Sequence, residues 1–305
     1  VADLIPLRLR SRKLEALWEP DARWELLPLP SQVSARYVSF TPLGEDRFAL
    51  ITLRSAEVLE VDSAAAWRSL PLPRSPRSHH AAVRLPSGEL MITGGLAPEG
   101  TALRSTEILG LDGVWRDGPE LTEARLRHSA VVTTGGTVLV FGGEREGRAL
   151  VTTERLRGDA WRRYDDGERA TTRGNLWPGD GFAVLTASDY FVWADHGRVW
   201  RLAEGALQMR TDETATLLDA EGEPSRDIAV PGMFRSAIQL RDGSIAAVVE
   251  RTLYRGREPF DAWEQLAELP PRLRGNLSLT ELQDGSLLVF ATEPFLQAAR
   301  LRLSE

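Results

Sequence analysis

Cysteine is absent from this chain of 305 residues, and lysine is nearly so, since Lys13 is the only one. Without cysteine there are no disulfides, thiolate metal ligands or cysteine nucleophiles. The net charge of −7 argues against nonspecific nucleic-acid binding, because neutralising phosphates requires a basic surface. The near-exclusive use of arginine among the basic residues fits a GC-rich, bacterial-like composition as well as it fits a chemical role.

Long hydrophobic runs are also lacking, because no apolar stretch approaches the roughly 18 residues of a membrane-spanning helix. We therefore expect a soluble protein without a membrane span. The first residues contain no charged-then-apolar leader, so we expect a protein that is cytoplasmic, or exported with its leader removed. No HExxH pattern, GxSxG elbow or glycine-rich phosphate loop occurs, so the sequence indicates no metal and no cofactor.

The most informative feature of the chain is a repeated segment. Residues 77–95 and 125–143 align at a constant offset of 48. Each copy contains an apolar strand, a glycine turn, a second apolar strand and a glycine pair, which predicts radial or stacked repetition of small β-sheets. The aligned positions include Arg77 with Arg125, His80 with His128, Gly88 with Gly136, and Gly94-Gly95 with Gly142-Gly143.

Fainter copies of this pattern continue along the chain. Apolar strands separated by hairpin turns such as Asp242-Gly243 and Asp284-Gly285 bring the count to six repeats. We expect each repeat to form one four-stranded antiparallel sheet. The predicted starts lie near residues 36, 77, 125, 175, 235 and 274.

The fourth repeat is irregular. Its strands are expected at 181–186, 190–193 and 198–202, without a glycine pair. The excess length falls in residues 211–232, which are acidic and are expected to form an irregular insertion. Two interpretations of this insertion are open: a solvated hairpin or loop, and a lobe that binds a partner.

Tryptophan provides an independent marker of the repeat. Trp67, Trp115 and Trp161 are separated by 48 and then 46 residues, and Trp263 holds the same place in the fifth copy. Trp24 has no repeat in front of it, and the last copy has no tryptophan of its own. The early tryptophan therefore indicates that an N-terminal strand completes the last sheet.

This closure makes the whole chain, 1–305, one β-propeller domain, with one or more closing strands in residues 1–30. Closing the ring removes the exposed edges that an open array of sheets would present. The order of strands in the closing sheet stays open, because residues 13–18 and residues 297–303 both fit its third strand.

Residues 77–161 resemble the kelch repeat of β-propellers. The likeness rests on an Arg/His-led apolar strand, a glycine turn, a second strand ending in Gly-Gly, a spaced glutamate (Glu107, Glu154) and a tryptophan about twenty residues further on. Two repeats match well, and the other four lack the glycine pair. The resemblance implies an all-β, six-bladed kelch-type propeller of four-stranded antiparallel blades around a central channel, and it implies no single activity.

Arginine recurs at or just before the first strand of most repeats, and these strand starts are expected to meet at one mouth of the channel. Guanidinium groups bind carboxylates and phosphates through paired hydrogen bonds, so such a ring would attract anions. The alternative is that each arginine ties blades together through carbonyls or through Glu107 and Glu154. The candidate ligand-binding residues are Arg36, Arg77, His79, Arg125, Arg127, Arg173, Arg235 and Arg274.

The histidines separate into two kinds. His80 and His128 share one repeat position, which is typical of an architectural residue rather than a catalytic one. His79 adjoins the expected channel mouth and is the better acid–base candidate. The sequence assigns no catalytic residue.

Two functions are compatible with these features. The preferred one is a non-catalytic binding propeller whose arginine-rich channel mouth takes an acidic peptide, an acidic protein or a small anionic ligand. The alternative is a carbohydrate-acting enzyme that resembles the kelch-type sialic-acid mutarotases. Galactose-oxidase-like copper chemistry is excluded, because the resemblance would require a cysteine-containing cofactor and the chain has no cysteine.

Overall fold

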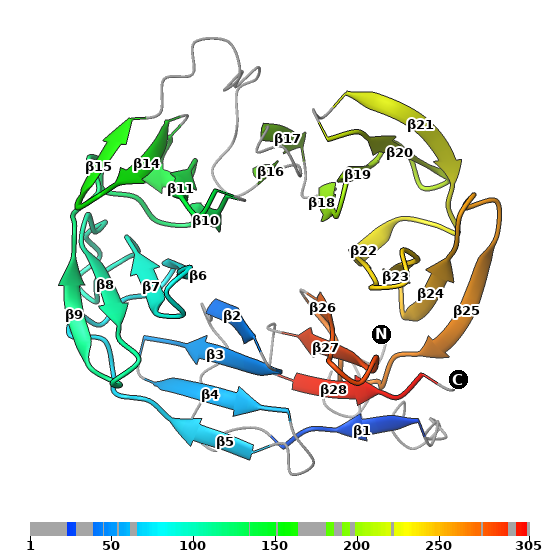
Figure 1. The fold of residues 1–305 in the computed structure, drawn as a ribbon, viewed down its shortest axis with the longest axis horizontal. Helices are drawn as coiled ribbons and strands as arrows, with labels where there is room; N and C mark the ends of the chain where they lie inside the picture. The colour runs from blue at the N-terminus through cyan, green and yellow to red at the C-terminus, as the bar shows by residue number, and fades with distance from the viewer. Residues whose placement is uncertain are drawn as a thin grey trace, which may run out of the picture.

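The computed structural model describes residues 23–28, 39–44, 46–53, 55–61, 66–133, 135–150, 152–163, 181–185, 191–195, 199–220, 223–275, 277–291 and 297–303. The regular elements in these ranges are β-strands. Most of them form six four-stranded antiparallel sheets arranged as the blades of a propeller, and the others form two two-stranded sheets (Figure 1). The expected all-β fold is therefore confirmed. No helix in the described part of the chain is long and apolar enough to cross a membrane.

The first three blades follow one another along the chain, and each begins with its innermost strand (Figure 1). The first blade contains β2 (Ser39–Gly44), β3 (Arg47–Ile51), β4 (Ala56–Glu60) and β5 (Ala66–Ser69). The second contains β6 (Ala81–Arg84), β7 (Leu90–Thr93), β8 (Thr106–Leu109) and β9 (Trp115–Gly118). The third contains β10 (Ser129–Val132), β11 (Val138–Phe141), β14 (Thr153–Arg157) and β15 (Ala160–Arg163), with a small hairpin of β12 (Glu144–Arg145) and β13 (Arg148–Ala149) between β11 and β14.

Two more blades follow the same order on the other side of the ring. One contains β18 (Val199–Leu202), β19 (Gly205–Met209), β20 (Thr214–Leu218) and β21 (Pro224–Ala229). The other contains β22 (Phe234–Gln239), β23 (Ile245–Val249), β24 (Thr252–Gly256) and β25 (Trp263–Glu268). A two-stranded sheet of β16 (Gly181–Leu185) and β17 (Phe191–Asp195) lies between β10 and β18 in the ring (Figure 1).

The region that starts near residue 175 differs from the prediction. The sequence predicts that 198–202 belongs with the strands at 181–186 and 190–193, but β18 pairs with β19 across a tight turn and so begins a separate blade. Residues 211–232 are not an insertion, because they supply β20 and β21 to that blade. β21 is exposed along most of its length, so its sequence lacks the apolar alternation that predicts a strand.

The last blade joins the two ends of the described chain. It contains β26 (Leu277–Glu281), β27 (Leu287–Ala291) and β28 (Gln297–Leu301), and its outermost strand is β1 (Trp24–Leu26). β1 pairs antiparallel with β28, with Trp24 opposite Leu301. Closure of the ring by an N-terminal strand is therefore confirmed. β28 is the third strand of this blade, and the competing segment 13–18 lies outside the described residues.

The tryptophans of the outermost strands link neighbouring blades. Trp115 in β9 donates from Nε1 to the carbonyl oxygen of Pro71, which follows the last strand of the preceding blade, at 2.7 Å. The indole therefore packs between two sheets and also fixes their spacing. Equivalent bonds join Trp67 to Pro28, Trp161 to Pro119 and Trp263 to Ala229, at 2.5, 3.0 and 2.8 Å.

The glycine pair of the second blade marks a close approach to the third. Gly94 has a φ of +54°, and a Cβ there would lie 2.5 Å from the carbonyl oxygen of Arg125 and 2.8 Å from Cε1 of His128. The N–H of Gly95 donates to the same carbonyl at 2.8 Å. Glycine is therefore required here both by the backbone conformation and by the neighbouring blade.

We expect Gly94→Ala to destabilise the protein more than Gly113→Ala. Both glycines have positive φ, +54° and +77°, so alanine at either position is strained by about 1 kcal/mol. A Cβ at Gly113 meets nothing within 4 Å, whereas a Cβ at Gly94 meets the backbone of the next blade. This overlap adds about 1–3 kcal/mol to the cost at Gly94. Urea unfolding of both variants checks the difference, and equal losses of stability would contradict the packing role of the glycine pair.

Candidate functional site

The candidate residues that the structure describes come from segments at one face of the ring. Each blade starts with its innermost strand, and successive strands are antiparallel, so the innermost strands begin at the same face. The connections between second and third strands, and those from blade to blade, meet at this face too. We call it the strand-start face.

The side chain of Arg77 lies inside the second blade, where only 1% of the residue is exposed. Its Nη2 forms an ion pair with Oε1 of Glu107 at 2.5 Å and donates to Oγ of Ser105 at 3.0 Å. Its Nη1 donates to the carbonyls of Gly94 and Ser105 at 3.0 and 2.8 Å, and its Nε donates to the carbonyl of Ser75 at 3.2 Å. Burial lowers the pKa of Arg77, and the charge and hydrogen bond of Glu107 act against that shift.

Glu107, in the third strand of the blade, holds the incoming chain as well as the arginine. Its carboxylate accepts the backbone N–H groups of Arg74 and Ser75 at 2.6 and 3.0 Å. The pair is therefore charge-balanced and its oxygens are hydrogen-bonded, which is the condition for a buried ion pair to be tolerated. We call this arrangement a clasp.

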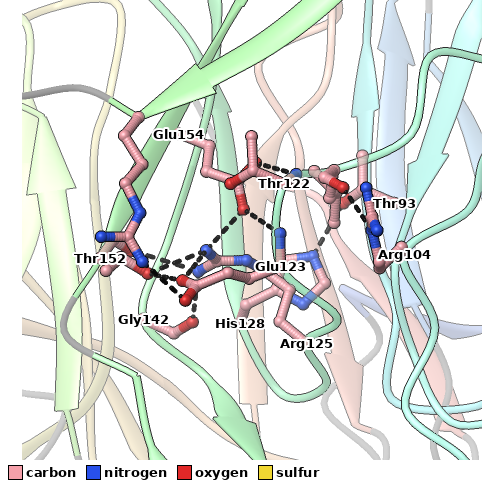
Figure 2. Close-up of polar contacts among 11 residues, drawn as sticks. Thr93, Arg104, Thr122, Glu123, Arg125, His128, Gly142, Thr152 and Glu154 are labelled. Carbon is pink, nitrogen blue, oxygen red and sulfur yellow. Dashed lines mark hydrogen bonds and ion pairs between the residues drawn. The ribbon is translucent and has the colours of Figure 1, made fainter.

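The third blade contains the same clasp (Figure 2). Arg125 pairs through Nη2 with Oε1 of Glu154 at 2.8 Å, and its Nη1 donates to the carbonyl of Gly142 at 2.7 Å. The Glu154 carboxylate accepts the N–H groups of Thr122 and Glu123 at 2.5 and 3.2 Å. The two copies of the repeat thus reproduce one network of contacts at the same positions.

These contacts correct the assignment of Arg77 and Arg125 to a ligand. Both side chains are buried, and every N–H of the Arg77 guanidinium already has an acceptor within the protein. The alternative role, in which arginine ties the chain together through carbonyls and through Glu107 and Glu154, describes both residues. Their positions in the sequence, just ahead of a first strand, do not show whether the side chains are buried.

His80 and His128 also serve the architecture. Nε2 of His80 lies 2.8 Å from Oγ of Ser39 in the first blade, and Nε2 of His128 lies 2.8 Å from Oγ1 of Thr93 in the second (Figure 2). Burial, assisted by the nearby arginine of each clasp, lowers the pKa of His80 to about 3 and that of His128 well below its usual range. Both histidines are therefore neutral links between blades, as their repeated position predicts.

His79 and Arg127 occupy one repeat position and lie at the strand-start face. Both have a φ of +53°, and the N–H of Arg127 donates to the carbonyl of His79 at 2.9 Å. Burial and the charge of Arg127 lower the pKa of His79 to about 4. The exposed guanidinium of Arg127 pairs with Glu144 at 2.9 Å. Of the two, Arg127 is the more accessible but already has a carboxylate partner.

Arg235 and Arg274 lie together at the strand-start face. Nη1 of Arg235 donates to the carbonyl of Glu250 at 3.0 Å, and its Nη2 donates to the carbonyl of Gly275. Arg235 therefore reaches the backbone next to Arg274 and next to a third arginine, Arg251. Arg251 is half-buried, and the charges of Arg274 and Arg235 contribute to lowering its pKa, after burial itself. We call Arg235, Arg251 and Arg274 the arginine triad.

Arg235 lies at a β-bulge. The register between β22 and β23 shifts between Phe234 and Ser236, so Arg235 has no cross-strand partner of its own. Phe234 and Ser236 are buried, whereas Arg235 is exposed. Bulges of this kind re-aim a side chain out of the sheet.

Arg274 corresponds to a clasp arginine that has lost its partner. The hairpin turn at Gly285 has the same backbone bonds as the turn at Gly88, and counting back from both glycines aligns Arg274 with Arg77. In the second blade, Ile92 lies opposite Glu107 of the third strand. The same alignment matches Ile92 with Val289 of the last blade, and the third-strand residue opposite Val289 is Ala299. Arg274 therefore has no glutamate to draw it into the blade, and it is exposed.

Arg251 was missed by the sequence reasoning, because it follows a second strand and no repeat pattern marks it. Arg36 and Arg173 lie outside the described residues. Within the described ranges, no group of three or more His, Asp or Glu side chains could hold a metal ion.

Comparisons with known proteins give partial similarities. No protein-family model matches the chain. It is similar to "Putative adagio-like protein 2" of Oryza sativa subsp. japonica, 30% identical over 151 residues, which is 47% of this chain and 23% of that protein. It is also similar to "Adagio-like protein 1" of the same species, 34% identical over 99 residues, or 30% of this chain and 16% of that protein. The matches thus span less than a quarter of these relatives' length.

The fold is similar to that of a solved structure of streptogramin B lyase. The TM-score is 0.62, and the similarity covers 92% of this chain and 97% of that one. Because the sequences are 10% identical, this similarity shows the propeller fold alone.

We expect Glu107→Gln to destabilise the protein by about 3 kcal/mol, because it leaves the buried Arg77 without its counter-charge. The matched control is Glu60→Gln, which removes the partner of Arg68, an arginine whose side chain is 72% exposed. An exposed pair is worth little, so the control should change stability by less than about 0.5 kcal/mol. Chemical unfolding measures both, and similar costs would show that the clasp does not hold the blade together.

We also expect the protein to lose stability as the pH falls below about 6.5. In the unfolded chain His80 and His128 take up protons near pH 6.5, whereas the folded protein protonates His80 only near pH 3. Each histidine therefore costs about 1.4 kcal/mol per pH unit below 6.5. The double variant His80→Gln/His128→Gln should have a flatter profile of unfolding free energy between about pH 6.5 and 4. Identical slopes would mean that the two histidines are not held neutral.

Proposed function

We propose that this chain is a non-catalytic binding propeller of the kelch type, which holds an acidic peptide, an acidic protein or a small anionic ligand on its strand-start face. The observation that carries the proposal is the arginine triad. Arg235 donates to the backbone beside Arg251 and beside Arg274, the charges of Arg235 and Arg274 contribute to lowering the pKa of Arg251, and among the described residues no carboxylate is within ion-pair distance of any of the three.

The triad contrasts with arginines elsewhere on the surface. Many of these are paired with a carboxylate, as Arg68 is with Glu60 and Arg226 with Glu258. The chain as a whole carries a net charge of −7, so carboxylates are not scarce. Three like charges held together in such a protein repel one another, and a bound anion relieves that repulsion.

Each member of the triad retains donors that no described group uses. Arg274 donates only from Nε, to the carbonyl of Pro271 at 2.7 Å, which leaves both terminal nitrogens. Arg251 donates from Nη2 to the carbonyl of Leu269 at 2.5 Å. These backbone bonds hold the guanidinium groups without neutralising them. Directional donors that are already oriented lose less entropy on binding a carboxylate or phosphate.

The kelch assignment rests on residues 77–161, where the clasps, the glycine pairs and the tryptophan bonds recur. The partial similarity to the adagio-like proteins is compatible with it. His79 and Arg127 flank the strand-start face in these blades and are proposed as secondary contacts. Arg36 and Arg173 retain the role that the sequence predicts for them, as further cations of the same mouth.

We favour binding over the carbohydrate-acting alternative because of the state of the acidic residues. A mutarotase-like site built on the kelch repeat would need the repeat's glutamates to be available beside its arginines. Glu107 and Glu154 are buried, and each already accepts hydrogen bonds from an arginine and from two backbone N–H groups. A proton taken up by either would break the clasp.

The proposal predicts that Arg235→Gln/Arg274→Gln weakens binding of an acidic peptide. Fluorescence anisotropy with a labelled peptide of alternating Glu and Gly should show a loss of at least about tenfold, since each charge-assisted contact is worth about 1.5–3 kcal/mol. The wild-type affinity should also fall with added salt. A peptide of alternating Gln and Gly controls for nonspecific binding.

Arg68→Gln is the matched control variant, because Arg68 is exposed on the outermost strand β5 and has a carboxylate partner. It should bind the acidic peptide like the wild type. Equal affinities of the double variant and the wild type, or equal affinities for the Glu and Gln peptides, would contradict the proposed function.

A further inference from the structure

We propose that the arginine triad is a site for a phosphoryl group, in preference to a single carboxylate. The inference rests on the proposed function, because it concerns the same anion-binding face. It adds the chemical class of the group that enters the triad: a tetrahedral dianion.

The first support is the geometry of anchoring. Arg235 is fixed by two backbone carbonyls, one beside Arg251 and the other beside Arg274. Arg251 is held through Nη2 and Arg274 through Nε, so the three guanidinium groups are anchored from three different segments of the chain. A carboxylate has two oxygens in one plane, whereas a phosphoryl group presents three oxygens in three directions. Three guanidinium groups from separate segments suit the three oxygens of a phosphoryl group better than the two oxygens of a carboxylate.

The second support is the balance of charge. The charged groups that act on Arg251 are Arg274, Glu268 and Arg235. At Arg251, therefore, three cations including Arg251 itself face one carboxylate, which is an excess of positive charge. A phosphoryl monoester carries about −1.5 to −2 charges at pH 7, whereas a carboxylate carries one. A dianion therefore offsets more of this positive excess than a single carboxylate does.

The third support is the origin of Arg274. In the second and third blades the arginine at this position is neutralised by a glutamate from the third strand. In the last blade that glutamate is replaced by Ala299, and the arginine turns outward. Arg274 is therefore a cation that the repeat pattern would have neutralised with a glutamate. It lies beside Arg235, the arginine at the bulge of the neighbouring blade.

The test compares three labelled peptides that differ at one residue, which is phosphoserine, glutamate or serine in an otherwise uncharged Gly/Ser sequence. At pH 7.5 the phosphoserine peptide should bind about tenfold more tightly than the glutamate peptide, and the serine peptide should bind weakest. Lowering the pH to about 5.5 removes much of the second phosphate charge, whose pKa is about 6. The preference for phosphoserine should then shrink, while the affinity for the glutamate peptide changes little because the arginines stay charged.

Arg274→Gln should abolish the preference for phosphoserine, and Arg68→Gln should preserve it. Arg274 is exposed and makes one hydrogen bond through its side chain, so this variant is expected to fold, which its melting temperature checks. Inorganic phosphate is the competitor that distinguishes the sources of the phosphoryl group. If inorganic phosphate displaces the phosphoserine peptide at concentrations near the Kd of that peptide, the ligand is a small phosphorylated molecule. If displacement requires a much higher phosphate concentration, the ligand is a phosphorylated protein segment. Either result supports a phosphoryl site.

Two results would overturn the inference, and only the second of them would also reject the proposed function. Equal binding of the phosphoserine and glutamate peptides, lost in Arg274→Gln, would reject the phosphoryl site and leave the proposed anion-binding face intact. Binding of both no tighter than that of the serine peptide would reject the site and the proposed function together.

Discussion

The buried ion pair between an arginine ahead of a blade and a glutamate in that blade's third strand organises the second and third blades, and its absence from the last blade leaves Arg274 exposed. In the second and third blades it orders the incoming chain, because the glutamate also accepts two backbone N–H groups from that chain. The arginine reaches the carbonyl that ends the second strand, at Gly94 or Gly142. One pair of side chains thus links the incoming chain, the end of the second strand and the third strand of a blade.

The same pair determines which arginines are available to a ligand. Where the glutamate is present, the guanidinium is drawn into the blade and its donors are used. Where the third strand offers Ala299 instead, Arg274 stays outside, and the bulge at Arg235 places a second arginine beside it. The binding face that we propose is therefore a consequence of the repeat pattern breaking down in the last two blades. The well-matched blades use their arginines in the clasps, and the last two blades supply the arginines of the proposed binding face.

The sequence predicted the fold better than it predicted the site, for a physical reason. Apolar strands, hairpin glycines and the spacing of tryptophan are local or periodic signals, so the four-stranded blades and the closing strand with Trp24 could be derived from them. The strand at 198–202 is predicted correctly but in the wrong blade, because its partner β19 follows directly across a short turn, and β21 is not predicted because its exposed sequence lacks apolar alternation. The role of an arginine depends on the residue opposite it on another strand. Arg77 and Arg274 occupy the same position ahead of their blades. Only the cross-strand register shows that the third strand offers Glu107 to the first and Ala299 to the second.

The most direct test of this account is an NMR titration that follows the arginine Nε–Hε signals as an acidic peptide is added. Signals of Arg235, Arg251 and Arg274 should shift with the peptide concentration, because their guanidinium groups take up the ligand. Signals of Arg77 and Arg125 should stay in place and exchange slowly with solvent, because both side chains are buried. Shifts at Arg77 and Arg125 without shifts at the triad would contradict the division between clasp arginines and binding arginines.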